Sequence, residues 1–330
     1  MKQIYILLIA LLMGLSANAE KSGTCGPNLK WHLTDNGVLT ISGKGEMYDY
    51  LEDYNRLPWS KSDIKRIIIG DGVTTIGGFA FASCSALTSV TIPNSVTEIG
   101  GGAFVGCSAL TSVTIPNSVT EIGGGAFYRC SSLTSVTIPN SVTKIGSDAF
   151  KDCSALTSVT IPNSVTTIGW GAFWGCRSLT SVTIPNSVTT IGNYVFYNCS
   201  SLTSVTIPNS VTTIRESAFE DCSNITQISS EAVVPPICYL GAFYRINKSK
   251  CKLIVPKNSL DAYKQAYQWK DFLLIEGSTT GITNTVYNKA GLADVYTIDG
   301  TKRLSKASTD EINALPKGVY IVNGKKIIIK

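Results

Sequence analysis

The sequence predicts a repeat solenoid of the α/β class, with a parallel β-sheet along one face, a β cap before the repeats and a small all-β domain after them. Two regularities support this prediction. The nonapeptide SVTIPNSVT occurs six times at intervals of 23 residues, and two columns of single residues share that interval. A fixed period of this length is typical of stacked structural units. The columns are Cys84, Cys107, Cys130, Cys153, Cys176, Cys199 and Cys222, and Phe81, Phe104, Phe127, Phe150, Phe173, Phe196 and Phe219.

Each unit combines one short strand with one tight turn. In residues 112–134, SVTIPNSVTEIGGGAFYRCSSLT, Val113 and Ile115 alternate with small hydroxyl residues, which is the period of a half-buried strand. Pro116 lacks the N–H that would continue a strand ladder. The spacing of the later apolar residues fits a helical or 3₁₀ turn on the opposite side of the coil. These inward residues are Val119, Ile122, Ala126, Phe127, Cys130 and Leu133.

A single unit buries too little apolar surface to offset the entropy lost on ordering its backbone. Stacking solves this problem, because parallel strands of neighbouring coils pair about 4.8 Å apart and close the core from both sides. We expect the solenoid, including a C-terminal cap, to occupy residues 66–276. Within that cap, the pattern predicts a helix from about Ser259 to Trp269, with Leu260, Tyr263 and Tyr267 on one face.

Two further segments flank the solenoid. In residues 20–65, Leu39 and Ile41 alternate with Thr40 and Ser42, which predicts an N-terminal β cap. After EGSTTG the composition changes, and we interpret residues 277–330 as a linker followed by a small β domain. Its closing GVYIVNGKKIIIK is typical of a hairpin that turns at Asn323-Gly324.

The repeat pattern L..V.IP..V..IG..AF..C..L resembles the BspA-like class of leucine-rich repeats, the 23-residue treponemal type, over roughly residues 64–256. This resemblance implies a right-handed leucine-rich-repeat solenoid with an extracellular binding or adhesion role, and residues 20–65 look like the β cap of that family. The tail, with its LPKGVYIV.GKK...K pattern, resembles the C-terminal sorting domains of exported Bacteroidetes proteins over residues 281–330. That second resemblance implies delivery to, or retention at, the cell surface.

The N-terminus predicts export. Lys2 precedes an apolar run from Ile4 to Leu15, and Ala17-Asn18-Ala19 provides the small residues of a cleavage site, so we interpret residues 1–19 as a signal peptide. No later stretch approaches the roughly 20 apolar residues of a transmembrane helix. The protein is therefore expected to be secreted or held at the cell surface, without a transmembrane segment.

Charge disfavours a nucleic-acid partner. The formal net charge is +5, yet residues 20–276 contain 19 basic and 19 acidic residues, and the excess lies in the signal peptide and the tail. A neutral solenoid lacks the basic stripe that phosphate binding requires.

The sequence does not favour catalysis or a cofactor. The single histidine, His32, stands in the predicted N-terminal cap, away from any nucleophile motif. Glu98 and Glu121 occupy the same repeat position, so they are expected one coil apart, near the carboxylate separation of retaining glycosidases. Lys144 follows in the same column, which favours a solvated row of charges over a hydrolase. We expect a protein that is not an enzyme.

The regular cysteines are expected to be buried, reduced thiols that fill the core. Parallel coils place equivalent Cβ atoms about 4.8 Å apart, beyond the range of about 3.5–4.5 Å for a disulfide, and zinc needs four converging ligands. No metal site is predicted. Cys238 and Cys251 bracket an irregular coil, and the sequence leaves open whether they are bridged or free. Cys25 has no evident partner.

Specificity is expected where the copies differ, at unit positions 13, 14, 17 and 18. Trp170 and Trp174 are four residues apart and should share a face, with Tyr194 and Tyr197 one coil away. Such a group suits a ligand-binding surface for a host matrix or cell-surface protein, or for a carbohydrate. The alternative is an aromatic ladder that only stabilises this side. The candidate ligand-binding residues are Tyr128, Trp170, Trp174, Tyr194 and Tyr197.

Overall fold

The computed structural model describes residues 21–50, 57–278 and, towards the C-terminus, 293–297, 300–308, 311–312, 314–316, 318–322 and 325–329. The predicted signal peptide, most of the predicted linker and the Asn323-Gly324 turn lie outside the described residues.

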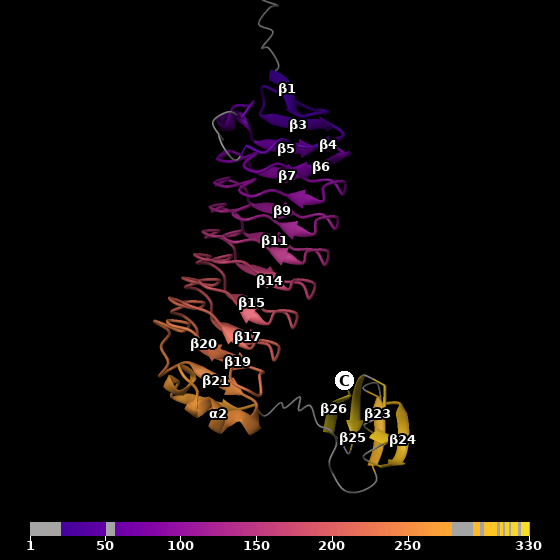
Figure 1. Ribbon diagram of the computed structural model, residues 1–330, viewed down its shortest axis with the longest axis vertical. Coiled ribbons are helices and arrows are strands. Elements are labelled where there is room, and N and C mark those ends of the chain that lie inside the picture. The colour runs from indigo at the N-terminus through magenta and orange to yellow at the C-terminus, as the bar shows by residue number, and fades with distance from the viewer. Residues whose placement is uncertain are drawn as a thin grey trace, which may run out of the picture.

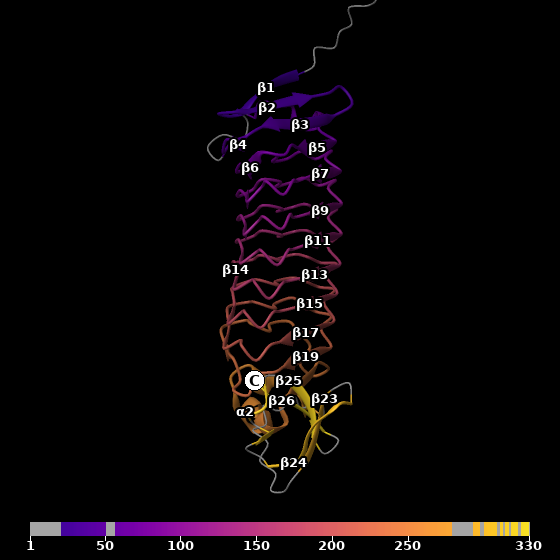
Figure 2. The ribbon, with the colours of Figure 1, turned by 90° about the vertical axis from the view of Figure 1, so that its right-hand side faces the viewer.

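Parallel strands stacked one per coil form the main face of the solenoid (Figures 1 and 2). A five-stranded sheet, in which β1, β2 and β3 are antiparallel and the rest parallel, is followed by an eight-stranded parallel sheet. The first sheet contains β1 (Lys21–Gly26), β2 (Leu29–Leu33), β3 (Val38–Gly43), β5 (Arg66–Ile69) and β7 (Ser89–Thr91). The eight-stranded sheet contains β9 (Ser112–Thr114), β11 (Ser135–Thr137), β13 (Ser158–Thr160), β15 (Ser181–Thr183), β17 (Ser204–Ile207), β19 (Gln227–Ser230), β21 (Lys252–Val255) and β22 (Leu274–Gly277).

Equivalent residues of successive repeats pair with each other. Ser112 lies opposite Ser135 and Val113 opposite Val136, so each residue pairs with the residue at the same position of the next unit. Within β9 the valine is buried and its serine and threonine neighbours are exposed. The predicted strand and its inward and outward faces are confirmed.

A second parallel sheet, which the sequence did not predict, runs along another side of the coils. Val119 and Ile122 are buried as expected, but Ile122 also belongs to a strand of two residues, too short to show a period. This second sheet has a six-stranded part and a separate three-stranded part. The first part contains β4 (Gly45–Glu46), β6 (Val73–Ile76), β8 (Glu98–Ile99), β10 (Glu121–Ile122), β12 (Lys144–Ile145) and β14 (Thr167–Ile168), and the other contains β16 (Thr190–Ile191), β18 (Thr213–Ile214) and β20 (Ile237–Cys238).

The third side of each coil consists of tight turns. The N–H groups of Tyr128 and Cys130 donate to carbonyls three residues earlier, at 3.0 and 3.1 Å, as in a 3₁₀ turn. A continuous helix does not form, because Gly125 and Arg129 have φ values of 63° and 59°, in the left-handed region. The Arg129 N–H instead donates to the Lys151 carbonyl of the next coil at 2.8 Å. Backbone hydrogen bonds therefore tie the coils together on all three sides.

The two repeated columns form the centre of the core. Successive phenylalanine rings from Phe81 to Phe243 stack with centroids 5.3–5.8 Å apart. Each regular cysteine from Cys107 onward also donates its S–H to a phenylalanine carbonyl of the preceding coil, as Cys130 does to Phe104 at 3.2 Å. The thiols therefore satisfy backbone acceptors in addition to filling space.

Apolar caps cover both ends of the stack. At the N-terminal end Leu39 and Ile41 are fully buried, and the Trp59 ring stacks on the Phe81 ring with centroids 5.5 Å apart. A 3₁₀ turn, η2 (Lys61–Asp63), follows Trp59. At the C-terminal end, Trp269 packs on Phe243, with ring centroids 4.9 Å apart. Three short helical segments form this second cap: η3 (Lys257–Ser259), α2 (Leu260–Gln265) and η4 (Trp269–Asp271).

The predicted C-terminal helix is shorter than expected. It ends at Gln265, because Ala266 has an extended backbone and Gln268 has a φ of 64°. Tyr263 is fully buried and its hydroxyl donates to the Ala232 carbonyl at 2.8 Å. Tyr267 lies beyond the end of the helix and is 61% exposed, so its predicted place on the same helix face as Tyr263 is wrong.

A separate antiparallel sheet lies near the C-terminus. The predicted hairpin is confirmed, since its two arms are paired throughout, with Gly318 opposite Ile329 at one end and Val322 opposite Lys325 at the other. The small core of this sheet includes Val295, Tyr320 and Val322. In spatial order the strands are β24 (Lys302–Ala307), β23 (Ala293–Thr297), β25 (Gly318–Val322) and β26 (Lys325–Ile329).

All ten cysteines are free and buried. Burial raises the pKa of Cys130 and of Cys238 to about 12, and that of Cys251 to about 11. Cys238 and Cys251, the pair left open by the sequence, are both free thiols in this structure, directed towards the carbonyls of Pro236 and Lys252 respectively.

The cysteines should therefore be unreactive in the folded protein, because thiolate is scarce at neutral pH and access is blocked. Titration with a thiol reagent should give almost no reaction under native conditions and all ten thiols after unfolding in guanidinium chloride. A count two lower after unfolding would contradict the free state of Cys238 and Cys251.

Replacing Arg129 by glycine should stabilise the stack. A side chain in the left-handed region costs about 1–2 kcal/mol, and glycine removes that strain against a smaller entropic loss. We expect Arg129→Gly to raise the free energy of unfolding by about 0.5–1 kcal/mol, measured by urea denaturation. Ser131→Gly is the matched control, because Ser131 does not have a left-handed backbone. This substitution should lower the free energy of unfolding by about 0.5–1 kcal/mol. Destabilisation by both variants would contradict this account.

Candidate functional site

Four of the five predicted aromatic residues form one packed cluster on the turn side of two neighbouring coils. The Trp170 and Trp174 ring centroids lie 5.3 Å apart. Tyr194 and Tyr197, on the next coil, lie 5.4 and 4.8 Å from the Trp174 ring. The repeat spacing therefore brings together the residues that the sequence placed together.

Tyr128, the fifth predicted residue, joins this cluster through Lys151, which was not among the predicted site residues. The Lys151 Nζ lies 5.5 Å from the Tyr128 ring centroid and 4.0 Å from that of Trp174. It also lies 3.5 Å from Asp148 Oδ1, and only 19% of the lysine side chain is exposed. The signal was present in the sequence, because Tyr128, Lys151 and Trp174 occupy the same unit position in successive repeats. We call these five aromatic residues together with Lys151 the aromatic cluster.

The aromatic cluster is less exposed than we expected. Trp170 is 39% exposed, whereas the other four rings are partly buried, Trp174, Tyr194 and Tyr197 against one another. Most neighbouring rings are tilted by about 55°, so they form a ridged surface and not a flat platform. The cluster therefore stabilises this side of the coils and also presents the Trp170 ring to solvent.

A groove continues from the aromatic cluster towards the C-terminal coils. It has a volume of about 520 Å³ and adds two carboxylates and an apolar wall to the rings. The Tyr194 hydroxyl donates to Glu216 Oε1 at 3.2 Å. Leu240 and Tyr244 are 72% and 56% exposed, although large apolar side chains are usually covered. Its lining residues are Trp174, Tyr194, Tyr197, Glu216, Ser217, Glu220, Leu240, Gly241 and Tyr244, and we call it the acidic groove.

The Leu240 end of this groove was not predicted from the sequence, because the repeat becomes irregular there. Between β19 and β20 the chain has one residue more than the regular copies, as the register of Thr213 opposite Ile237 shows. Ile237 therefore takes a position that Thr190 and Thr213 hold in earlier coils, and it is 67% exposed. An unexpected apolar residue in a polar column was the signal available in the sequence.

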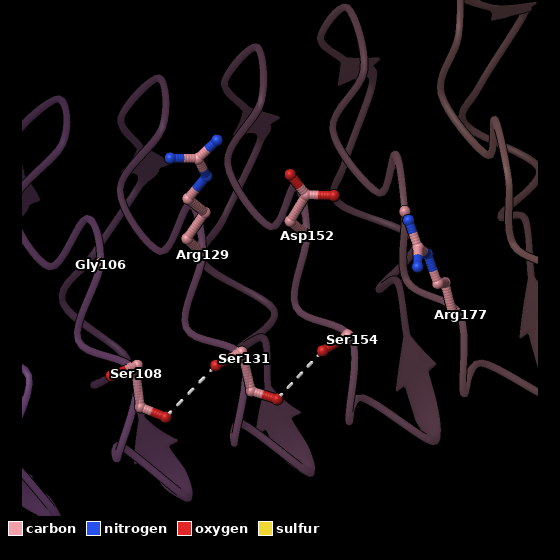
Figure 3. A pocket seen from close by; sticks show the side chains of 8 residues that line it. Gly106, Ser108, Arg129, Ser131, Asp152, Ser154 and Arg177 are labelled. Atoms are coloured by element: carbon pink, nitrogen blue, oxygen red, sulfur yellow. Dashed lines mark hydrogen bonds between the residues drawn. The ribbon is translucent and has the colours of Figure 1, made fainter.

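A second hollow lies beside the serine column of the central coils (Figure 3). Its volume is about 500 Å³, and Arg129, Asp152 and Arg177 project from successive coils. Below them the Ser154 hydroxyl donates to the Ser131 carbonyl at 3.3 Å. Because the charges alternate in sign, this hollow has no single electrostatic preference.

The carboxylates considered for hydrolysis lie where the sequence placed them. Glu98 and Glu121 are register neighbours in the second sheet, and the Lys144 Nζ contacts Glu121 Oε1 at 2.6 Å. About half of each of the Lys144 and Glu121 side chains is exposed, and neither glutamate lines one of the two hollows described above. This geometry fits a solvated charge column.

Within the described residues, no group of three or more His, Cys, Asp or Glu side chains is arranged to hold a metal ion. The same part of the chain contains no helix with the length and hydrophobicity needed to span a bilayer.

Asp148 is held in an unfavourable charged state. Burial raises the pKa of its carboxyl above the ordinary value, and the nearby Lys151 ammonium only partly opposes this. Between the unfolded pKa of about 4 and the higher folded value, the folded state retains a proton that the unfolded state has lost. The free energy of unfolding therefore falls as the pH rises through that window, and this loss of stability remains at neutral pH.

Asp148→Asn removes this titration. The variant should be more stable than the original protein at neutral pH, and the difference should shrink as the pH falls below the ordinary aspartate pKa. Urea denaturation of both proteins across a pH series measures the effect. A variant that is less stable at neutral pH would show that the ion pair with Lys151 outweighs burial.

The chain matches the family model described as the BspA type leucine rich repeat region, in six copies, over residues 58–179 and 143–273. A comparison with curated proteins gives no match.

Solved structures of bacterial repeat proteins are similar to the chain. A leucine-rich repeat protein from Eubacterium ventriosum is 26% identical over 74% of this chain and 83% of its own, with a TM-score of 0.44. The leucine rich repeat protein of T. pallidum is 29% identical over 62% of this chain and 91% of its own, with a TM-score of 0.48. A leucine rich cell surface protein from Faecalibacterium prausnitzii is 24% identical over 78% of this chain and 94% of its own, with a TM-score of 0.42.

The family model covers well over half of the chain, and its repeats coincide with the stacked coils described above. The chain therefore belongs to the BspA-type leucine-rich repeat family.

Proposed function

We propose that the protein is a non-enzymatic binding protein that acts outside the cell, secreted or at the cell surface, and that its aromatic cluster contacts a host matrix or cell-surface protein. The observation that supports this best is the place of the cluster. The rings stand at variable positions of a repeat whose other residues are nearly fixed. Membership of a repeat family that provides scaffolds for binding agrees with this, as do the predicted signal peptide and the sorting-like tail.

The chemistry of the cluster suits a protein ligand. Tyrosine and tryptophan are enriched at protein interfaces, because each buries a large area at a small cost in side-chain entropy. Trp170 offers an exposed ring, and the partly buried rings of Trp174 and Tyr194 hold it in place. A rigid aromatic ridge of this kind can enter a complementary recess in a partner with little loss of conformational freedom.

Carbohydrate is the alternative ligand. The exposed ring of Trp170 supports it, since sugars stack on the faces of exposed aromatic rings. The tilt of 55° between Trp170 and its neighbours Trp174 and Tyr194 favours protein instead, because an extended glycan stacks best on a flatter row of rings.

The aromatic cluster should control binding. With the whole chain immobilised, matrix proteins, host-cell surface proteins and a glycan array are screened for ligands, and Trp170→Ala/Tyr197→Ala is compared with the original protein. We expect a protein ligand whose affinity falls at least about tenfold in the double variant, as is typical of central aromatic contacts.

Ser112→Ala/Thr114→Ala, on the exposed edge of β9, provides the matched control and should bind normally. Circular dichroism verifies that both variants are folded. Glycans as the sole ligands would support the alternative, and unchanged binding by the aromatic variant would remove the cluster from the proposal.

A further inference from the structure

One column of side chains crosses both the aromatic cluster and the acidic groove. At unit position 17, successive coils contribute Tyr128, Lys151, Trp174, Tyr197, Glu220 and Tyr244. Backbone hydrogen bonds fix their order, since Asn198 N–H donates to the Glu220 carbonyl at 2.8 Å and Asp221 N–H to the Tyr244 carbonyl at 3.1 Å. The column therefore reads aromatic, cation, two aromatics, acid and aromatic along the stack.

The first half of this column contains its own cation. The Lys151 ammonium lies between aromatic rings, 4.0 Å from the Trp174 centroid and 5.5 Å from that of Tyr128, with the Asp148 carboxylate 3.5 Å away. This is a complete cation–π site with an acidic partner. It demonstrates that the spacing of the coils suits an ammonium group held between aromatic side chains.

The second half has the rings and the acid, but its neighbouring cation lies outside the groove lining: the Arg245 guanidinium is 5.5 Å from the Tyr244 ring centroid. Tyr197 and Tyr244 flank Glu220 in the column, and Glu216 lines the same groove. None of the described lining residues is basic, and no ion pair within residues 57–278 involves either glutamate.

The two basic residues that adjoin groove residues in the sequence, Arg215 and Arg245, already have partners. The Arg245 guanidinium pairs with the Asp221 carboxylate at 3.0 Å, and that of Arg215 lies 5.0 Å from the Tyr239 ring centroid. The two groove carboxylates are therefore available to a positive charge from outside the molecule.

The apolar wall limits what kind of cation fits. Leu240 and Tyr244 are exposed beside the carboxylates, and Gly241 leaves the space between them open. The methylene stem of a lysine or arginine can lie along such a wall while its charged end reaches the acids. A small hydrated metal ion would leave this wall uncovered.

We infer that the acidic groove binds a lysine or arginine side chain of the partner protein, held between the rings of Tyr197 and Tyr244 and the carboxylates of Glu216 and Glu220, next to an apolar residue that covers Leu240. This inference deepens the proposed function and rests on it. The aromatic cluster supplies contact area, and the groove selects ligands by charge.

The test uses the whole chain and three acetylated, amidated pentapeptides of sequence Gly-Leu-X-Leu-Gly, in which X is lysine, norleucine or glutamate. Norleucine keeps the stem of lysine without its charge. We expect the lysine peptide to bind at least about tenfold more tightly than the norleucine peptide, and the glutamate peptide to bind most weakly, measured by NMR titration. Added salt should weaken only the lysine peptide.

Glu216→Gln/Glu220→Gln removes both charges but keeps an acceptor for the Tyr194 hydroxyl. It should abolish the preference for lysine, whereas Glu98→Gln/Glu121→Gln, which removes two carboxylates from the second sheet, should preserve it. Equal binding of the lysine and norleucine peptides, or a preference that survives in Glu216→Gln/Glu220→Gln, would overturn the inference.

A second measurement distinguishes failure of this inference from failure of the proposed function. It uses the protein ligand identified in the screen with Trp170→Ala/Tyr197→Ala. If Trp170→Ala/Tyr197→Ala weakens that ligand and Glu216→Gln/Glu220→Gln does not, the binding function stands and the charge-selecting groove is refuted. If both variants weaken it, both are supported. If neither does, both are refuted.

Discussion

The in-register pairing of each coil with the next is the constraint on which the rest of the structure depends. Every residue of a regular unit lies beside its counterpart 23 positions away, and backbone hydrogen bonds enforce this on the strand side, on the side of the short second sheet and on the turn side. The pairing converts a linear repeat into columns of like side chains. Stacked phenylalanines and hydrogen-bonded thiols are direct results of it.

The same constraint divides the positions of a unit into two classes. Inward columns must fit identical neighbours above and below, so they tolerate little change in volume. Outward columns need only suit solvent, and there the chain places residues as different as Lys151 and Trp174 one coil apart. The aromatic cluster and the acidic groove lie on such an outward side, although the left-handed backbone at Tyr194 and Ser217 shows that some of their positions are sterically costly.

Much of the fold could be predicted because its causes repeat in the sequence. The strand at Ser112–Thr114 and the columns of Phe127 and Cys130 follow from alternation and period. The two-residue strand at Glu121–Ile122 could not be predicted, since it is too short for any periodicity, and the early end of the helix at Gln265 depends on the local backbone of Gln268.

The candidate site was partly predictable for the same reason. Trp170, Trp174, Tyr194 and Tyr197 could be grouped because they are aromatic as well as correctly spaced. Lys151 and Glu220 share the unit position of Trp174 and Tyr197, but their charged side chains do not resemble the rings, so position was the sole signal for them. The exposed Leu240 follows an irregular coil, where the period no longer locates residues in space.

The six identical copies of SVTIPNSVT have a consequence for assembly. A nascent coil cannot distinguish its proper neighbour from the one beyond it by these residues, so a misaligned stack with one unit looped out forms almost the same local contacts. The correct alignment is therefore specified by the caps and the irregular last coils, whose sequences are unique. Gain or loss of a whole unit would thus leave the architecture intact while changing the distance between any two surface features that it separates.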